Sequence, residues 1–122
     1  MSVMPKCCCL LLLLAGIHCT AIAKDSPSAQ MRAELITRWM KQRLELTSQQ
    51  ISRVEVLNLK YEKQIDKVTA TNVGFPCMQA VRDTIKEKEE HLKKLLTPIQ
   101  FVVYSEGKNE LKEQLKRCKN KK

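Results

Sequence analysis

Glycine and proline, the residues that most often mark turns, are scarce: the 122 residues contain only 3 Gly and 4 Pro. An all-β fold with many short strands needs more turn residues than this. Aromatic residues are also rare, at 4%, so a core has to be built mainly from Leu, Ile and Val. Hydrophobic residues (43%) and charged residues (29%) are balanced as in globular proteins, which excludes a disordered tail and a membrane-embedded chain. The sequence therefore predicts a small all-α protein with a thin core.

The N-terminal residues have the pattern of a secretory signal peptide. Lys6 supplies a positive charge, residues 7–17 are an 11-residue apolar stretch, and residues 21–23 (Ala-Ile-Ala) have the small-x-small form of a cleavage site. The apolar stretch is shorter than the roughly 20 residues of a membrane-spanning helix. We expect residues 1–23 to be a cleaved signal peptide and residues 24–122 to be one helical domain without a transmembrane segment.

Negative charge is in short supply. The chain has 22 Lys and Arg against 13 Asp and Glu, a net charge of +9, or +8 once Lys6 has left with the signal peptide. Such a surface attracts anions and acidic partners. Nucleic acid is not expected among them, because the chain is marked for export and has few aromatic residues on which bases could stack.

Apolar residues recur at helical spacing in four stretches of the expected mature chain. These predict helices over residues 29–45, 48–69, 77–95 and 98–118, with Asn72, Gly74 and Pro76 interrupting the pattern in the middle. Residues of the third stretch that are expected to face inward are Met78, Val81, Ile85, Leu92 and Leu95.

One pentapeptide pattern, L-T-x-x-Q, occurs twice, at residues 46–50 (LTSQQ) and 96–100 (LTPIQ). If each Thr is an N-cap, its hydroxyl accepts a hydrogen bond from the backbone N–H of the Gln. The Gln side chain in turn accepts one from the Thr backbone N–H. The preceding Leu then packs against the residue after the Gln as a hydrophobic staple. The pattern predicts two such corners, each opening a helix, at Leu46, Thr47 and Gln50 and at Leu96, Thr97 and Gln100.

An exported, basic, helical chain with two L-T-x-x-Q motifs resembles the Spy/CpxP group of periplasmic proteins, over essentially all of residues 24–122. The resemblance implies a periplasmic four-helix, hairpin-type fold that pairs into a curved homodimer. It implies an ATP-independent chaperone that holds unfolded or amphipathic clients, with a regulatory adaptor docked on an envelope sensor's exported domain as the alternative. The candidate client surface combines basic with adaptable apolar side chains: Arg32, Arg38, Trp39, Met40, Lys41, Arg43, Arg53, Lys60 and Met78.

Only two of the six cysteines, Cys77 and Cys118, remain after the expected cleavage. An even pair in an exported chain favours a disulfide. If the last two helices fold back antiparallel, both cysteines lie at the same open end, and an intramolecular bridge would stabilise by about 4 kcal/mol. Two reduced thiols and an intermolecular link are the alternatives.

Residue types suited to catalysis or metal binding are sparse. His91 is the one histidine of residues 24–122, and it lies among Glu and Lys residues, where a partly exposed surface histidine is expected. A Ser–His–Asp hydrolase would need a positioned base, and a metal site would need several converging ligands. A glycine-rich phosphate loop is absent as well. We therefore expect neither an enzyme nor a protein that binds a metal or a cofactor.

Overall fold

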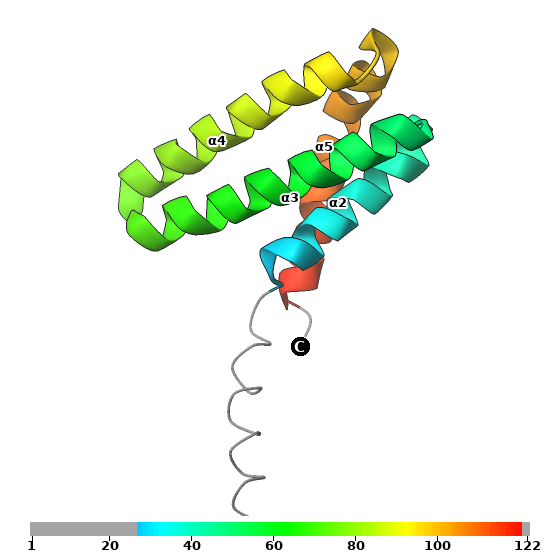
Figure 1. Cartoon of the computed structure of the whole chain (residues 1–122). Coiled ribbons are helices and arrows are strands. Elements are labelled where there is room, and N and C mark those ends of the chain that lie inside the picture. Colours follow the sequence, from blue (N-terminus) through cyan, green and yellow to red (C-terminus); the bar gives the residue numbers. More distant parts are fainter. Residues whose placement is uncertain (1–26, 121–122) are drawn as a thin grey trace, which may run out of the picture.

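The computed structural model describes residues 27–120, which form four α-helices and, over that range, no strand (Figure 1). This confirms the all-α prediction. The predicted signal peptide lies outside the described residues, and none of the described helices is long and apolar enough to cross a membrane. The helices are α2 (Ala29–Leu44), α3 (Ser48–Thr71), α4 (Gly74–Leu95) and α5 (Pro98–Asn120).

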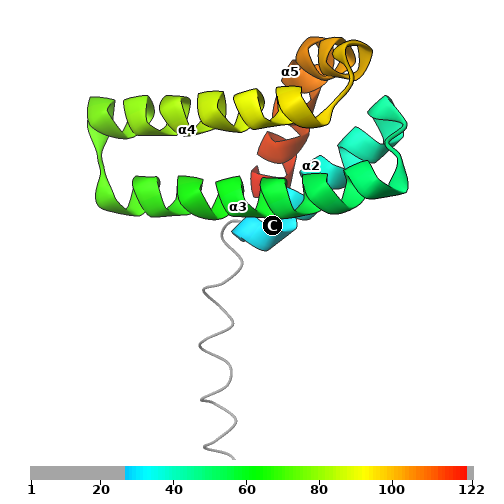
Figure 2. The same ribbon diagram turned by 45° about the horizontal axis from the view of Figure 1, so that its top comes forward.

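The helices α3 and α4 form a long antiparallel hairpin (Figures 1 and 2). α2 packs along α3, and α5 packs mainly on α2, touching α4 only to a small extent. Because α2 and α5 cover one end of the hairpin, the turn between α3 and α4 projects beyond them, at the left of Figure 1.

The core lies where the two corners bring α2 and α5 against the hairpin. The rings of Trp39 and Tyr104 meet edge to face there, with centroids 6.4 Å apart, a favourable geometry for aromatic pairs. The buried apolar residues of this cluster are Ile36, Trp39, Met40, Leu44, Val54, Leu92, Leu96, Tyr104 and Leu111.

Gly107 explains how closely α5 approaches α2. Glycine inside a helix costs about 1 kcal/mol relative to alanine, which from the sequence alone is a weakness of α5. A Cβ atom on Gly107 would lie 2.7 Å from Cζ2 of Trp39. The missing side chain therefore leaves the room that the indole occupies, and Trp39 Nε1 donates a hydrogen bond to Glu110 of α5 at 2.6 Å.

The inward face of α4 differs from the predicted one. Met78 and Ile85 are 57% and 40% exposed, so their prediction as inward residues is wrong. The face that packs on the hairpin partner instead buries Thr84, Lys88 and Leu92, which are spaced one turn apart. The reason is that α5 turns away onto α2, so α4 has a neighbour on one side only and part of its apolar stripe stays uncovered.

Candidate binding surface

Both predicted capping boxes are present. Thr47 Oγ1 accepts from the backbone N–H of Gln50 at 3.1 Å, and Gln50 Oε1 accepts from the backbone N–H of Thr47 at 3.0 Å. The bonds between Thr97 and Gln100 have the same lengths, 3.1 and 3.0 Å. Each box satisfies two of the backbone N–H groups that a helix start leaves without partners. These contacts confirm that Thr47 and Thr97 open α3 and α5.

The two glutamines also bond to each other, which the sequence does not reveal. Gln50 Nε2 donates to Gln100 Oε1 at 2.7 Å, and Gln100 Nε2 donates to Gln50 Oε1 at 3.2 Å. Each Nε2 atom also donates to a carbonyl group at the C-terminal end of another helix. Gln50 Nε2 donates to Leu95 O of α4 at 3.2 Å, and Gln100 Nε2 donates to Leu44 O of α2 at 3.1 Å. Each amide therefore joins the start of one helix to the end of another, and the two corners are held together.

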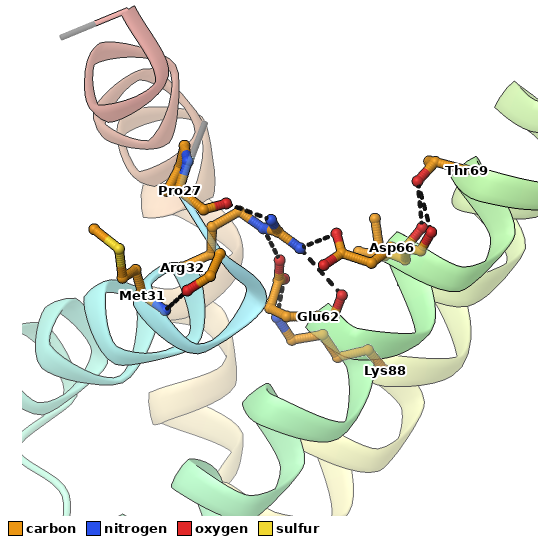
Figure 3. Close-up of polar contacts among 9 residues, drawn as sticks. Pro27, Met31, Arg32, Glu62, Asp66, Thr69 and Lys88 are labelled. Carbon is orange, nitrogen blue, oxygen red and sulfur yellow. Dashed lines mark hydrogen bonds and ion pairs between the residues drawn. The ribbon is translucent and has the colours of Figure 1, made fainter. Parts of the chain in front are cut away.

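Away from the corners, a cluster of ion pairs fastens α2 to the α3–α4 hairpin (Figure 3). Arg32 Nε lies 2.6 Å from Glu62 Oε1, and Arg32 Nη2 lies 2.7 Å from Asp66 Oδ1. Lys88 of α4 places its Nζ 3.9 Å from Glu62 Oε2. The Glu62 side chain is only 7% exposed, so one buried carboxylate serves two cations from two other helices. Arg32 is therefore bound within the fold, and its prediction as a client-binding residue is wrong.

Burial lowers the pKa of both cations in this cluster, but the net change in pKa has opposite directions for Arg32 and Lys88. For Arg32, burial alone lowers the pKa, but the hydrogen bonds and charges of Glu62 and Asp66 together raise the pKa above its usual value. For Lys88, burial outweighs the attraction of Glu62 and Glu89, and the pKa is lowered from 10.5. Lys88 is thus the group in the cluster whose charge is least favoured by its surroundings.

The lowered pKa of Lys88 predicts a pH dependence of stability. Between the folded-state pKa and 10.5, the unfolded chain holds a proton on Lys88 that the folded chain has released, so the free energy of unfolding rises with pH. We expect the wild type to gain stability relative to Lys88→Met as the pH is raised from neutral toward 10.5. Urea denaturation of both proteins across this range measures it, and a constant difference between them would contradict it. Contributions from tyrosines are common to both proteins and cancel.

His91 lies at the α3–α4 interface rather than on a free surface. Its Nδ1 lies 2.7 Å from the hydroxyl of Tyr61, which in turn lies 3.1 Å from Glu87 Oε2. The ring is half-buried, in agreement with the partial exposure expected from the sequence. The polar contacts of Tyr61 across the hairpin could not be predicted from the sequence, because they join residues on two helices. His91 therefore holds the hairpin together.

The predicted intramolecular disulfide is absent, since Cys77 and Cys118 are both free thiols. Cys77 lies in the first turn of α4, beside the α3–α4 turn. Cys118 lies near the end of α5, beside the start of α2, where it lines a pocket with Pro27, Met31 and Leu35. The prediction assumed that α4 and α5 run back along each other, whereas α5 packs on α2.

The remaining candidate surface residues do not form one continuous face. Trp39 and Met40 are 4% and 0% exposed, so their prediction as client-binding residues is wrong and both belong to the core. Arg43 is paired with Glu110 and lies 5.6 Å from the Trp39 ring centroid. Lys60 Nζ lies 5.1 Å from the centroid of the Tyr61 ring. Arg53 is exposed. Met78 lies close to the α3–α4 turn, away from the other candidate residues.

Two of the predicted residues, Arg38 and Lys41, line a groove of about 540 Å³ between α2 and α3. Both residues are exposed. Across from them, α3 contributes Val56, which is 71% exposed, and Leu59. The other lining residues are Gln30, Ala33, Glu34, Thr37 and Glu55. The groove combines apolar area with charges of both signs. Val56 and Leu59, its apolar wall, are not among the surface residues predicted from the sequence.

No protein-family model, no curated protein and no solved structure matches the chain. The resemblance to the Spy/CpxP group therefore rests on the two L-T-x-x-Q motifs and on the helices around them.

Among residues 27–120, no three His, Cys, Asp or Glu side chains lie together in a way that could hold a metal ion.

Proposed function

We propose that the chain is a Spy/CpxP-like periplasmic protein that binds unfolded or amphipathic protein segments without ATP. The groove between α2 and α3 is the observation that carries this proposal. Its apolar wall, with Val56 71% exposed, faces the exposed cations Arg38 and Lys41. A client segment that has an acidic residue next to an apolar one can cover Val56 and Leu59 while its carboxylate meets the cations.

The distribution of exposed apolar side chains favours a chaperone over an adaptor with a single partner. A docking surface for one partner is expected to gather its apolar anchors into one patch. Here they are spread over all four helices and a turn, amid a positively charged surface, which suits weak contacts with clients of varied sequence. The exposed large apolar residues are Met31, Val56, Val73, Phe75, Met78, Ile85, Ile99 and Val102.

A homodimer is part of the proposal. α4 has a neighbour along one side only, and exposed Ile85 lies on its uncovered part. A second copy of the chain that covers this side of α4 would enlarge the thin core of a domain this small.

Suppression of aggregation tests the proposal. The chain beginning at Lys24, which contains every described helix, is mixed with an acidic, reduced and unfolded model protein, and light scattering is followed without ATP. We expect suppression near equimolar ratio that weakens at high salt, because attraction between exposed charges is screened. The variant Arg38→Gln, Lys41→Gln, Val56→Ser should need several times more protein for the same effect.

The matched control is Arg53→Gln, Lys112→Gln, Ile99→Ser, which removes two exposed cations and one exposed apolar side chain outside the groove. It should suppress aggregation as the wild type does. Equal loss in both variants would show that the groove is not the client site. No suppression by the wild type at any ratio would exclude the chaperone, and one stable partner in place of varied clients would favour the regulatory adaptor.

A further inference from the structure

The end of the α3–α4 hairpin is free of charge over an unusual length. Residues 68–81, which we name the tip, contain no Asp, Glu, Lys, Arg or His, although 29% of the chain is charged. This is the longest uncharged stretch in residues 24–122. It covers the last turn of α3, the connection to α4 and the first two turns of α4. In a basic and polar protein, 14 consecutive uncharged residues at one projecting end require an explanation.

The tip exposes large apolar side chains. Val73 is 83% exposed, Phe75 is 70% exposed and Met78 is 57% exposed. The tip lies at the part of the hairpin that α2 and α5 do not reach (Figures 1 and 2). Gly74 begins α4 with a φ of 66°, a conformation that glycine adopts at little cost and that turns the chain sharply between Val73 and Phe75. Three of the eight exposed large apolar side chains among the described residues therefore lie at one outward end of the molecule.

Basic residues flank the tip on both helices. Lys63 and Lys67 precede it and Arg82 and Lys86 follow it, and all four are exposed. None of them makes a salt bridge within the described part of the chain. Of the two acids in the same segments, Asp66 is engaged with Arg32 of α2 at 2.7 Å, while Asp83 is exposed. The flanks of the tip are thus positively charged.

We propose that the tip docks on an anionic lipid surface. Val73, Phe75 and Met78 enter the boundary between lipid headgroups and acyl chains, and the basic residues of the two flanks meet the lipid phosphates. Apolar side chains combined with Lys and Arg are the usual chemistry of segments that lie at this boundary. The hairpin would then stand on the membrane with α2, α5 and the groove held away from it.

A second copy of the chain fits the tip less well than a lipid surface. Three side chains can cover only a few hundred Å², whereas a stable protein interface buries about 800 Å² on each partner. Two tips placed end to end would also bring their basic flanks close together, and like charges repel. Lipid phosphates have the opposite sign and provide as much surface as the tip can use.

Vesicle sedimentation tests this proposal with the chain beginning at Lys24. The vesicles contain either phosphatidylcholine alone or phosphatidylcholine with one third phosphatidylglycerol. We expect binding to the anionic vesicles that weakens at high salt, and about tenfold weaker binding to the zwitterionic ones. The variant Phe75→Ser, Met78→Ser should lose binding by about tenfold or more. The matched control Ile99→Ser, Val102→Ser, which also removes two exposed apolar side chains, should bind as the wild type does.

A second measurement reports the tip directly. In Phe75→Trp, the tryptophan emission should shift to the blue with anionic vesicles, whereas wild-type emission from Trp39, which is 4% exposed, should not change. No binding to anionic vesicles, or equal loss in the tip variant and its control, would overturn the proposal. A lower solution mass of the tip variant without lipid, with no vesicle binding by the wild type, would assign the tip to a second copy instead. The groove and the tip share no residue, so the aggregation assay fails or succeeds independently of this one.

Discussion

Replacing Gln50 with Ala is expected to lower the free energy of unfolding by about 2–4 kcal/mol. The side chain caps the start of α3 through the Thr47 backbone N–H at 3.0 Å. It also donates to Leu95 O at 3.2 Å and to Gln100 Oε1 at 2.7 Å. Each such bond contributes roughly 1 kcal/mol, and its loss leaves part-buried groups without partners. Urea denaturation, followed by helical circular dichroism, measures the change.

Gln49→Ala is the matched control, because Gln49 is exposed, precedes Gln50 directly and has the same side chain. It should change stability by less than about 0.5 kcal/mol. Gln100→Ala should cost about as much as Gln50→Ala, since the two residues make equivalent contacts. The double variant should cost about 1 kcal/mol less than the two single ones added together, because each single variant already removes the bonds between the glutamines. If the stability loss of the double variant equals the sum of the two single losses, the idea that the corners stabilise each other is wrong.

The features that could be predicted from the sequence are those that depend on residues close together in it. A capping box needs only a Thr and a Gln three residues apart at the start of an apolar pattern. Thr47 and Thr97 therefore could be placed at helix starts, and all four helices could be located. The bonds between Gln50 and Gln100 connect residues 50 positions apart, and their existence depends on which corners meet.

The predictions that failed all depended on an assumed neighbour. Helical spacing locates an apolar stripe, but it does not say which helix covers it. Assigning α5 to α4 made Cys77 and Cys118 partners and placed Ile85 inside, whereas α5 packs on α2. Trp39 is predicted at the surface because an apolar stripe in a small chain can pack either in the core or against a partner, and helical spacing does not distinguish the two.

The basic residues illustrate the same limit at the candidate site. Arg32 and Arg38 both lie on α2, and the sequence around them does not distinguish their roles. In the fold, Arg32 faces Glu62 and Asp66 of α3 and is bound by both. Arg38 lines the groove and, among the described residues, makes no salt bridge. Whether a cation is available to a partner is decided by the acids on the neighbouring helix.

The second large effect is expected at Glu62, where Glu62→Gln should lower the free energy of unfolding by about 3 kcal/mol. The carboxylate accepts from Arg32 at 2.6 Å and lies 3.9 Å from Lys88, and its side chain is only 7% exposed. Removing its charge leaves two cations from two helices without a buried counter-charge, which costs more than the loss of a surface pair. Urea denaturation at neutral pH measures the change.

Asp66→Asn is the matched control for Glu62→Gln. Asp66 lies one turn further along α3 and binds the same guanidinium at 2.7 Å, but its side chain is 53% exposed. The loss should therefore stay below about 1 kcal/mol. Adding Lys88→Met to Glu62→Gln should restore part of the stability, because it removes a buried cation whose charge the surroundings already disfavour. Equal losses in Glu62→Gln and Asp66→Asn would show that burial does not set the strength of this cluster, and that α2 is held to the hairpin by its apolar core instead.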